Sequence, residues 1–374
     1  MDTNFNEQQR AIQSSARDFF QNECPTTVVR ELEESDLGYS QEMWREMADL
    51  GWLGLTYPER YGGSEGGLLD LYVIYIEMGR SICPSPHLAA VIRAGETILA
   101  AGNDDQKESI LPKIAAGKMV VAPAFMEPAG EYGPTGIQLR ATVSPNGHTL
   151  TGAKILVPYA HVAQHLLVAA RTGDAAEAIT LFLVDPHAHG IAIERMDNIA
   201  GYPLFAITLN NVSVNAANVV GKVDGGWRAL APVLNRAAVL QCAEIVGAGE
   251  RVMELAVGYA KDRVQFGRPI GQYQAVQYLC SDIAIGMHVT SLLSREAAWL
   301  IDEGEPSTKH VSIAKGYASG AIQLIVHQGQ EVHAGVAFML EHDMQLYTRR
   351  AKHWEFNLGD SAYHYEKIAE ALEA

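Results

Sequence analysis

The sequence predicts an α+β protein built as a helical domain over residues 1–119, an antiparallel β domain over 120–222 and a helical bundle over 223–374. Two observations predict this order. Apolar residues recur at three- and four-residue spacing in the first and third blocks, as they do on the buried face of a helix. Short apolar runs separated by Gly, Pro, Asn and Asp fill the middle block, which is typical of consecutive strands.

The first block contains helices that are separated by Gly- and Pro-rich turns. Trp44 and Met47 mark the apolar face of one helix, and the segment 57–63 ends it and turns the chain. We expect a further helix from 68 to 80 and a last one over 106–116. These helices predict a compact N-terminal domain.

In the middle block the spacing of apolar residues changes from that of helices to that of strands. Apolar or alternating runs occupy residues 148–151, 155–157, 166–169 and 179–184, with turn-forming residues between them. A parallel sheet would need a helix in each connection, and none of these gaps is long enough for one. The pattern therefore predicts antiparallel strands.

The third block returns to helix. Apolar stripes at helical spacing run along residues 252–259, 276–287 and 313–324. Long amphipathic helices joined by short links predict an antiparallel bundle.

Charge is the first guide to function. The chain has 374 residues with 44 acidic and 28 basic side chains, which gives a net charge of −16. A surface this acidic argues against nucleic acid or an anionic membrane as the main partner. The first residues are acidic and polar where a signal peptide would be basic and then apolar. No run of about 18 apolar residues is present, so we expect a cytoplasmic protein without a membrane span.

Common cofactor and metal motifs are absent from the sequence. There is no GxGxxG after a strand, no Walker loop, no HExxH and no GxSxG. His187 and His189 lie two residues apart without a carboxylate or thiol cluster, so no metal site is expected. The cysteines form no CxxC pair, and we expect four free thiols: Cys24, Cys83, Cys242 and Cys280.

One basic segment, residues 259–270, has an unusual composition. Arg263 and Arg268 flank Phe266 and Gly267, and guanidinium groups beside a ring and a turn suit the pyrophosphate and base of a nucleotide. A helix end whose basic residues offset the dipole, followed by a proline stop, explains the same residues equally well. A polyanionic ligand would need the places where cations concentrate: Lys261, Arg263 and Arg268, and secondly Arg349, Arg350 and Lys352.

Several segments, spread in order over nearly the whole chain, resemble the acyl-CoA dehydrogenase family, especially its divergent, heteromer-forming members of steroid side-chain degradation. They are MADLGWLGLTYPERYGG at 47–63, EMGR at 77–80, AG and LPKIAAGK within 101–118, Glu127-Pro128, YAKDRVQFGRPIGQYQAVQ at 259–277 and HAGVAFMLEHDMQLYTRRAK at 333–352. The resemblance implies a middle domain like a β-barrel and a C-terminal four-helix bundle.

The resemblance also implies a reaction. In this family FAD binds between subunits, a glutamate removes the α-proton of an acyl-CoA thioester, and the β-hydride passes to the flavin. Arg263, Gln265 and Phe266 match positions that hold the pyrophosphate and adenosine of the neighbouring subunit's FAD, which implies at least a dimer. Glu331 and Gly335 fall in a loop that contacts the adenosine. Electron-transfer flavoprotein or a similar acceptor is the implied redox partner.

The half of the site that performs chemistry departs from the family pattern. Met126 stands before Glu127-Pro128 where members have threonine, and residues 129–133 lack the usual Gly-Ser-Asp. Leu-Val-Pro at 156–158 replaces a Trp-Ile-Thr that contacts the flavin, and Glu331 replaces a glutamine. The cationic half of the flavin site is therefore retained, and the catalytic half is changed.

The catalytic base is missing from both positions that the family uses, which are Leu358 and Ala237 in this sequence. Glu244 is the remaining candidate, because Ala237, Gln241 and Glu244 are spaced to share one helix face. If that face lines the acyl pocket, Gln241 contacts the substrate and Glu244 lies about 10 Å from the usual base position. The alternative is a buried structural glutamate paired with an arginine or an interface group.

Two functions follow from the resemblance. The chain is an active FAD-dependent acyl-CoA dehydrogenase whose base has moved to Glu244, or it is a non-catalytic subunit that completes the FAD site of another chain in a heteromer. A related flavin oxidase on the same fold is a weaker third alternative. In each case we expect a homo- or hetero-oligomer, a dimer or tetramer.

Overall fold

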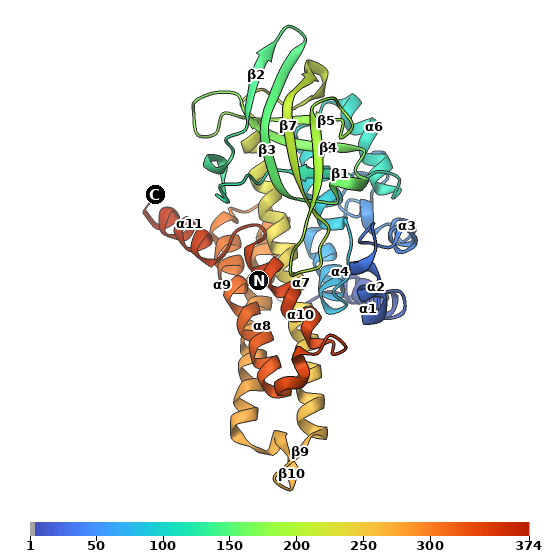
Figure 1. Ribbon diagram of the computed structural model, residues 1–374, viewed down its shortest axis with the longest axis vertical. Coiled ribbons are helices and arrows are strands. Elements are labelled where there is room, and N and C mark those ends of the chain that lie inside the picture. Colours follow the sequence, from blue (N-terminus) through green and yellow to red (C-terminus); the bar gives the residue numbers. More distant parts are fainter. Residues whose placement is uncertain (1–3, 374) are drawn as a thin grey trace.

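The computed structural model describes residues 4–373 and confirms the succession of a helical region, a sheet and a helical bundle (Figure 1). The N-terminal region contains the predicted helix 68–80 with those bounds, and the expected 106–116 helix begins two residues earlier. Its main helices are α1 (Glu7–Glu23), α2 (Thr26–Glu34), α3 (Gln41–Asp49), α4 (Leu68–Arg80), the π-helix η3 (His87–Glu96), α5 (Thr97–Ala101) and α6 (Asp104–Ala115).

Helix α4 is the buried centre of this region, and its first turn is capped from another domain. The Asp302 carboxylate, at the end of a bundle helix, accepts from the backbone amides of Leu68 at 2.6 Å and Leu69 at 3.0 Å. These amides have no partner within α4, so the carboxylate satisfies them and complements the helix dipole. The cap ties the N-terminal region to the bundle.

The middle region is one eight-stranded sheet in the order β6-β7-β3-β2-β4-β5-β8, with β1 beside β4. The sheet is antiparallel as predicted except around β4, which pairs in parallel with β1, from Val121 opposite His165, and with β2, at Arg140 opposite Arg171. The intervening β2–β3 hairpin brings the chain back without a crossover helix. The strands are β1 (Val121–Ala124), β2 (Arg140–Ser144), β3 (Gly147–Pro158), β4 (His165–Arg171), β5 (Ile179–Val184), β6 (Ile191–Met196), β7 (Leu204–Asn215) and β8 (Val219–Val220).

The two predicted runs 148–151 and 155–157 form a single strand, β3. Its pairing with β7 shifts register between Leu150 and Gly152 and again between Lys154 and Val157. A bulge leaves residues out of the ladder and bends the strand. The sequence therefore has a gap in its alternation where the structure has a bent but continuous strand.

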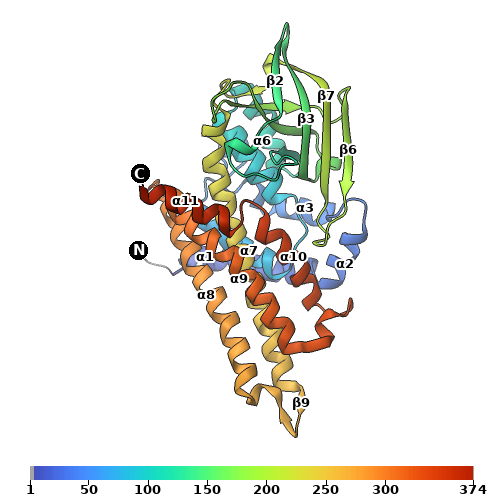
Figure 2. The same cartoon turned by 60° about the vertical axis from the view of Figure 1, so that its left-hand side comes forward.

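The third region is a bundle that projects away from the sheet (Figures 1 and 2). A short β9–β10 hairpin (Val264–Gln265 and Arg268–Pro269) joins its first two helices and forms the far tip. The helices are α7 (Gly226–Asp262), α8 (Gln274–Asp302), α9 (Thr308–His333), α10 (Met344–Phe356) and α11 (Ser361–Glu373).

Helix α7 is the core helix of the bundle and touches α4 at two glycines. A Cβ on Gly247 would lie 1.7 Å from the Ile76 carbonyl oxygen, and one on Gly79 would lie 1.9 Å from the Glu244 carbonyl oxygen. Only glycine allows the two backbones to approach this closely. Among the described helices α7 alone is long and apolar enough to cross a membrane, and 61% of that window is buried inside the protein, as in a core helix.

Candidate functional site

A cavity of about 510 Å³ lies where the sheet, η3, α7 and the α10–α11 junction meet. Its walls are largely apolar, and they come from segments far apart in the chain. Helix α7 contributes one face of its first turns. The principal apolar lining residues are Phe125, Met126, Ile137 and Leu156 from the sheet region, Leu230, Leu234 and Ala238 from α7, and Phe356 and Leu358 from the junction. A wider groove of about 980 Å³ adjoins it and shares Tyr132, Trp227 and Tyr363, so the cavity opens toward the surface there.

A buried ion pair fixes the turn that supplies Phe125 and Met126 to the cavity. The Lys154 ammonium lies 2.7 Å from the Glu127 carboxylate and donates to the Phe125 carbonyl at 3.2 Å. The same carboxylate accepts from the backbone amides of Gln138 and Leu139. Burial lowers the pKa of Lys154 to about 8, and the Glu127 charge opposes that shift. Glu127 and Lys154, which the sequence marks only as parts of motifs, thus position one cavity wall.

A second buried lysine holds the opposite wall. Lys315 on α9 donates to the backbone carbonyls of Gly359 at 2.8 Å and Trp354 at 3.1 Å, and to the Ser319 hydroxyl at 2.6 Å. These bonds fix the α10–α11 junction, where Leu358 has a left-handed φ of 66°. Leu358, at the family's usual base position, therefore enters the cavity as an apolar side chain on a tightly held loop.

Glu244 lies outside this cavity. The cavity-lining positions of α7 end at Ala238, and Glu244 is six residues further, which corresponds to roughly 9 Å along the helix. Its carboxylate accepts from the Trp354 indole nitrogen at 3.1 Å, beside the Arg350 charge. The structure thus places Glu244 against α10, at Trp354.

Gln241 does not line the cavity either, although the sequence places it on the same helix face. It is fully buried, and neither its amide nitrogen nor its amide oxygen has a hydrogen-bond partner. Leaving a buried amide unpaired is costly. Gln241 and Glu244 together form a polar layer beyond the cavity floor rather than part of its wall.

Burial raises the pKa of Glu244 to about 7, against the opposing Arg350 charge and Trp354 hydrogen bond. Between pH 4.5 and about 7 the folded protein therefore holds a proton on Glu244 that the unfolded chain has released. The free energy of unfolding falls as pH rises through this window. Glu244→Gln should remove that dependence and be more stable than wild type above pH 7, by up to about 3 kcal/mol. Urea denaturation at about pH 5 and about pH 8 measures it, and equal pH slopes in both proteins would contradict a protonated Glu244.

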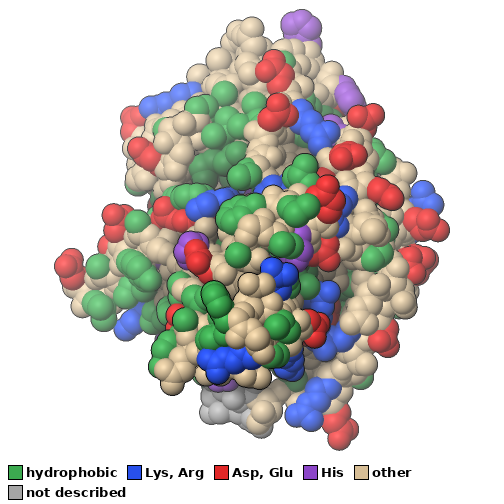
Figure 3. Space-filling view, turned by 60° about the horizontal axis from the view of Figure 1, so that its bottom comes forward, with side chains coloured by type: hydrophobic (Ala, Val, Ile, Leu, Met, Phe, Trp, Pro, Cys, Tyr) green, Lys and Arg blue, Asp and Glu red, His purple; other side chains and the backbone are tan. Residues whose placement is uncertain are grey.

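The basic segment forms the exposed tip of the bundle, far from the cavity of its own chain (Figure 2). Phe266 and Gly267 both have positive φ, as a type I′ hairpin turn requires, and Phe266 is 93% exposed. Arg263 and Gln265 are exposed beside it, whereas Arg268 lies over the Tyr273 ring at 4.1 Å. Figure 3, turned toward this end, shows Lys and Arg side chains among hydrophobic ones. These residues cannot reach the cavity of the same chain.

The other residues assigned to the adenosine lie in and beside the loop at the end of α9. The Glu331 side chain is 59% exposed and lies 3.9 Å from His327, and Gly335 is exposed. The second predicted concentration of cations is not free for an anion, because Glu33 lies 2.6 Å from Arg349 and 3.4 Å from Arg350.

Arg93 is a basic residue that lines the cavity and that is not among the site residues predicted from the sequence. The only signal in the sequence is a lone arginine inside the apolar run HLAAVIRAGETI. A charged residue in such a run is a surface residue in most helices. Here most residues of the helix η3 are buried, so the Arg93 guanidinium lies at the cavity instead of on the outer surface.

Comparisons with known proteins place the chain in one family. Family models described as acyl-CoA dehydrogenase N-terminal domain and acyl-CoA dehydrogenase C-terminal domain match residues 6–118 and 224–373. A probable acyl-CoA dehydrogenase, YngJ of Bacillus subtilis, is 27% identical over the full length of both chains. A chain of the ChsE4–ChsE5 complex from Mycobacterium tuberculosis superposes with a TM-score of 0.91 at 26% identity, covering 100% of this chain and 99% of that one. Butyryl-CoA dehydrogenase from Megasphaera elsdenii gives 0.90 at 26% identity over both whole chains.

Proposed function

The chain belongs to the acyl-CoA dehydrogenase family, and from that premise we propose that it is a subunit of an FAD-dependent enzyme that desaturates an acyl-CoA thioester between Cα and Cβ. The observation that carries this proposal is the cavity between sheet and bundle, which has the volume and the largely apolar lining that an acyl chain needs and opens toward the surface through the adjoining groove. The α-proton leaves to a base, the β-hydrogen leaves with its electron pair, and a double bond forms.

The residues present fit FAD, provided that two chains share it. The apolar walls at Phe125 and Leu156 suit a flat ring system. The cations that line the same cavity, Arg93, Lys352 and Lys367, come from three different helices, and Lys352 pairs with Glu355, so they do not form the cluster that a pyrophosphate needs. Exposed cations lie instead beside the hairpin, at Arg263, too far from the cavity of their own chain to serve it, so we assign them to a neighbouring chain's FAD. When bound, the flavin supplies the acceptor for the hydride.

An apolar stripe supports assembly with a second chain. Tyr278, Ile285 and Leu292 are exposed and seven residues apart on α8, so they lie on one face of the helix next to the hairpin. A repeat of seven on an exposed helix face is typical of helix packing between chains. A homo- or hetero-oligomer would bury this stripe and bring the hairpin to a neighbour's cavity.

The proposed base is Glu244, whose pKa of about 7 suits proton abstraction near neutral pH. For this role the acyl group must extend past Ala238 toward Trp354. A specific observation favours the alternative, a non-catalytic partner subunit: among the described residues that line the cavity, Glu131 is the only carboxylate, and it lies exposed at the mouth. Turnover of an acyl-CoA panel that Glu244→Gln abolishes without loss of bound flavin supports Glu244 as the base; unchanged turnover in that variant contradicts it.

The shared flavin site is tested by purifying the chain alone and with its co-expressed partner, and measuring bound FAD per chain by absorbance. Arg263→Ala together with Phe266→Ala should reduce bound FAD at least tenfold, because the hairpin supplies charge and stacking to a neighbour. The residues are exposed, so the melting temperature of the flavin-free protein should not change. Arg140→Ala, an exposed arginine on β2, is the matched control. Full flavin content in the hairpin variant would overturn the shared site.

A further inference from the structure

Arg93 carries a positive charge into the cavity without any partner for it. It lies on η3 and lines the cavity, and its Nε atom is buried with no hydrogen-bond partner. No carboxylate of the described chain forms an ion pair with it. Its guanidinium carbon lies over the ring of Phe125, 5.5 Å from the ring centroid.

The other arginines of the protein interior are satisfied, which makes Arg93 an exception. Arg171 donates to the carbonyls of Ile137 and Pro134, and Arg236 pairs with Glu96 at 2.6 Å. Arg350 donates to the Ala200 carbonyl and lies near Glu33. Burying an unpaired charge is among the most expensive features a fold can carry. An exception of this kind inside a cavity points to a ligand that supplies the missing anion.

The backbone around Arg93 is held rigidly. The Tyr57 hydroxyl donates to the Val91 carbonyl at 2.7 Å, and the Thr97 hydroxyl donates to the Arg93 carbonyl at 2.6 Å. The segment is a ten-residue π-helix, a form that is rare and frequent at functional sites. A rigid backbone presents the guanidinium in the cavity before any ligand arrives, so little ordering is lost on binding.

The groups around Arg93 do not neutralise it. His353 is uncharged, because burial and the charges of Arg350 and Arg93 lower its pKa to about 3. The pKa of Arg93 is lowered by burial to about 10, so it remains charged at neutral pH. Lys352 and Lys367 also line the cavity, Lys352 paired with Glu355 at 2.9 Å, and Glu131 is exposed at the mouth. The cavity therefore has a positive interior in a protein of net charge −16.

We propose that Arg93 binds a carboxylate carried by the acyl group, so that the preferred substrates are CoA thioesters with a second, distal carboxyl group. A guanidinium offers a planar pair of donors that matches a carboxylate. One unpaired guanidinium balances one negative charge, whereas a dianionic phosphate would leave excess charge in an apolar cavity. The assignment rests on the proposed function, because it takes the cavity to be the acyl site.

A neutral acyl group of equal size would leave the guanidinium buried and unpaired, so it should bind roughly 100-fold more weakly. The probes are ω-carboxyacyl-CoA thioesters of several chain lengths, each matched with its ω-methyl ester. Their dissociation constants are measured by calorimetry on the flavin-loaded oligomer. Three variants are compared with wild type: Arg93→Met, Arg93→Lys and the exposed control Arg140→Gln.

Wild type and Arg140→Gln should prefer the carboxylate at every length that reaches Arg93, Arg93→Lys should keep part of the preference, and Arg93→Met should lose it. Because the half-buried guanidinium has a buried Nε without a hydrogen-bond partner, Arg93→Met should not lower the melting temperature of the unliganded protein. A wild type without preference, an Arg93→Met that keeps it, or an Arg93→Met that loses flavin instead would overturn the assignment. Preference without turnover would leave the carboxylate site standing and count against the dehydrogenase; turnover without preference does the reverse.

Discussion

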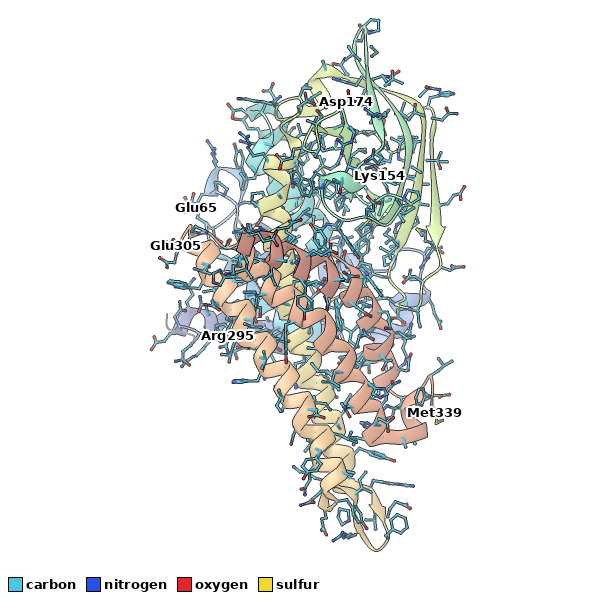
Figure 4. The ribbon with its side chains drawn as sticks, turned by 90° about the vertical axis from the view of Figure 1, so that its left-hand side faces the viewer. Glu65, Lys154, Asp174, Arg295, Glu305 and Met339 are labelled. Atoms are coloured by element: carbon cyan, nitrogen blue, oxygen red, sulfur yellow. The ribbon has the colours of Figure 1, made fainter. Side chains whose placement is uncertain are left out.

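Lys154→Met should lower the free energy of unfolding by about 3–5 kcal/mol and weaken flavin retention in the assembled protein. The reason is that the substitution leaves the Glu127 carboxylate buried with its charge uncompensated, which costs more than the pair itself contributes. Figure 4 shows Lys154 inside the sheet region, and its ammonium also bonds the Phe125 carbonyl. Loss of the ammonium therefore frees the turn that supplies Phe125 and Met126 to the cavity.

Urea denaturation followed by circular dichroism measures the first effect, and FAD retained after gel filtration measures the second. Lys113→Met, which removes an exposed lysine on α6, is the matched control and should change stability by less than about 0.5 kcal/mol. The double variant Glu127→Gln with Lys154→Met should recover part of the loss, because no charge is then left unpaired. A double variant as unstable as Lys154→Met would show that packing, rather than charge, is what the lysine provides.

The order of helical and β regions could be predicted from the sequence, because the spacing of apolar residues shows which face of each helix or strand is buried. Helix 68–80 and the change to short strands after residue 120 follow from period alone. The parallel pairing of β1 with β4 could not be predicted this way, since a strand's partner depends on a contact more than 40 residues away in the chain. The continuity of β3 could not be predicted either, because the alternation of apolar and polar residues fails where a strand bends, whether or not the strand ends there.

The site was predictable in part, and its limits have a physical cause. Helical spacing predicts that Ala237, Gln241 and Glu244 share one face of α7, but the cavity is lined by Ala238 and not by Ala237, so the face that meets the cavity is turned away from Glu244. The cavity ends at Ala238, because the next turns of α7 are closed by α4 at Gly79 and by Trp354. Whether a residue lines a cavity depends on where the neighbouring helices and strands end, and the spacing of apolar residues within one helix carries no information about that.

The positions of charged residues in the sequence are a similarly limited guide to the site. In a chain with a net charge of −16, an anionic ligand is expected at the few clusters of cations in the sequence. The cluster at Arg349 and Arg350 is not available to a ligand, because both side chains form ion pairs with Glu33. Two cations without a carboxylate partner among the described residues lie far apart: Arg263 beside the hairpin and Arg93 in the cavity. A cluster in sequence is therefore a poor guide to an anion site. An isolated arginine without a partner in space is a better one.

Lys315→Met should lower the free energy of unfolding by about 2–4 kcal/mol and loosen the α10–α11 junction that forms one wall of the cavity. The ammonium is fully buried without a paired carboxylate, and it is stabilised by carbonyl dipoles at the carboxyl end of α10, where a positive charge is favourable. Methionine fills a similar volume but leaves the carbonyls of Trp354 and Gly359 buried and unbonded. The junction that carries Leu358 should then open, since its left-handed φ depends on these bonds.

Chemical denaturation measures the stability of Lys315→Met, and hydrogen exchange of the amides of residues 354–364 reports the junction. Exchange there should rise at least tenfold while the sheet is unchanged, because the junction opens locally before the whole protein unfolds. Lys309→Met removes an exposed lysine from the first turn of the same helix and should leave both measurements at the wild-type value. A variant that loses stability with uniform exchange would mean that Lys315 supports the bundle as a whole. Faster exchange confined to the junction would mean that the wall opposite Phe125 is set by a lysine the reaction never touches.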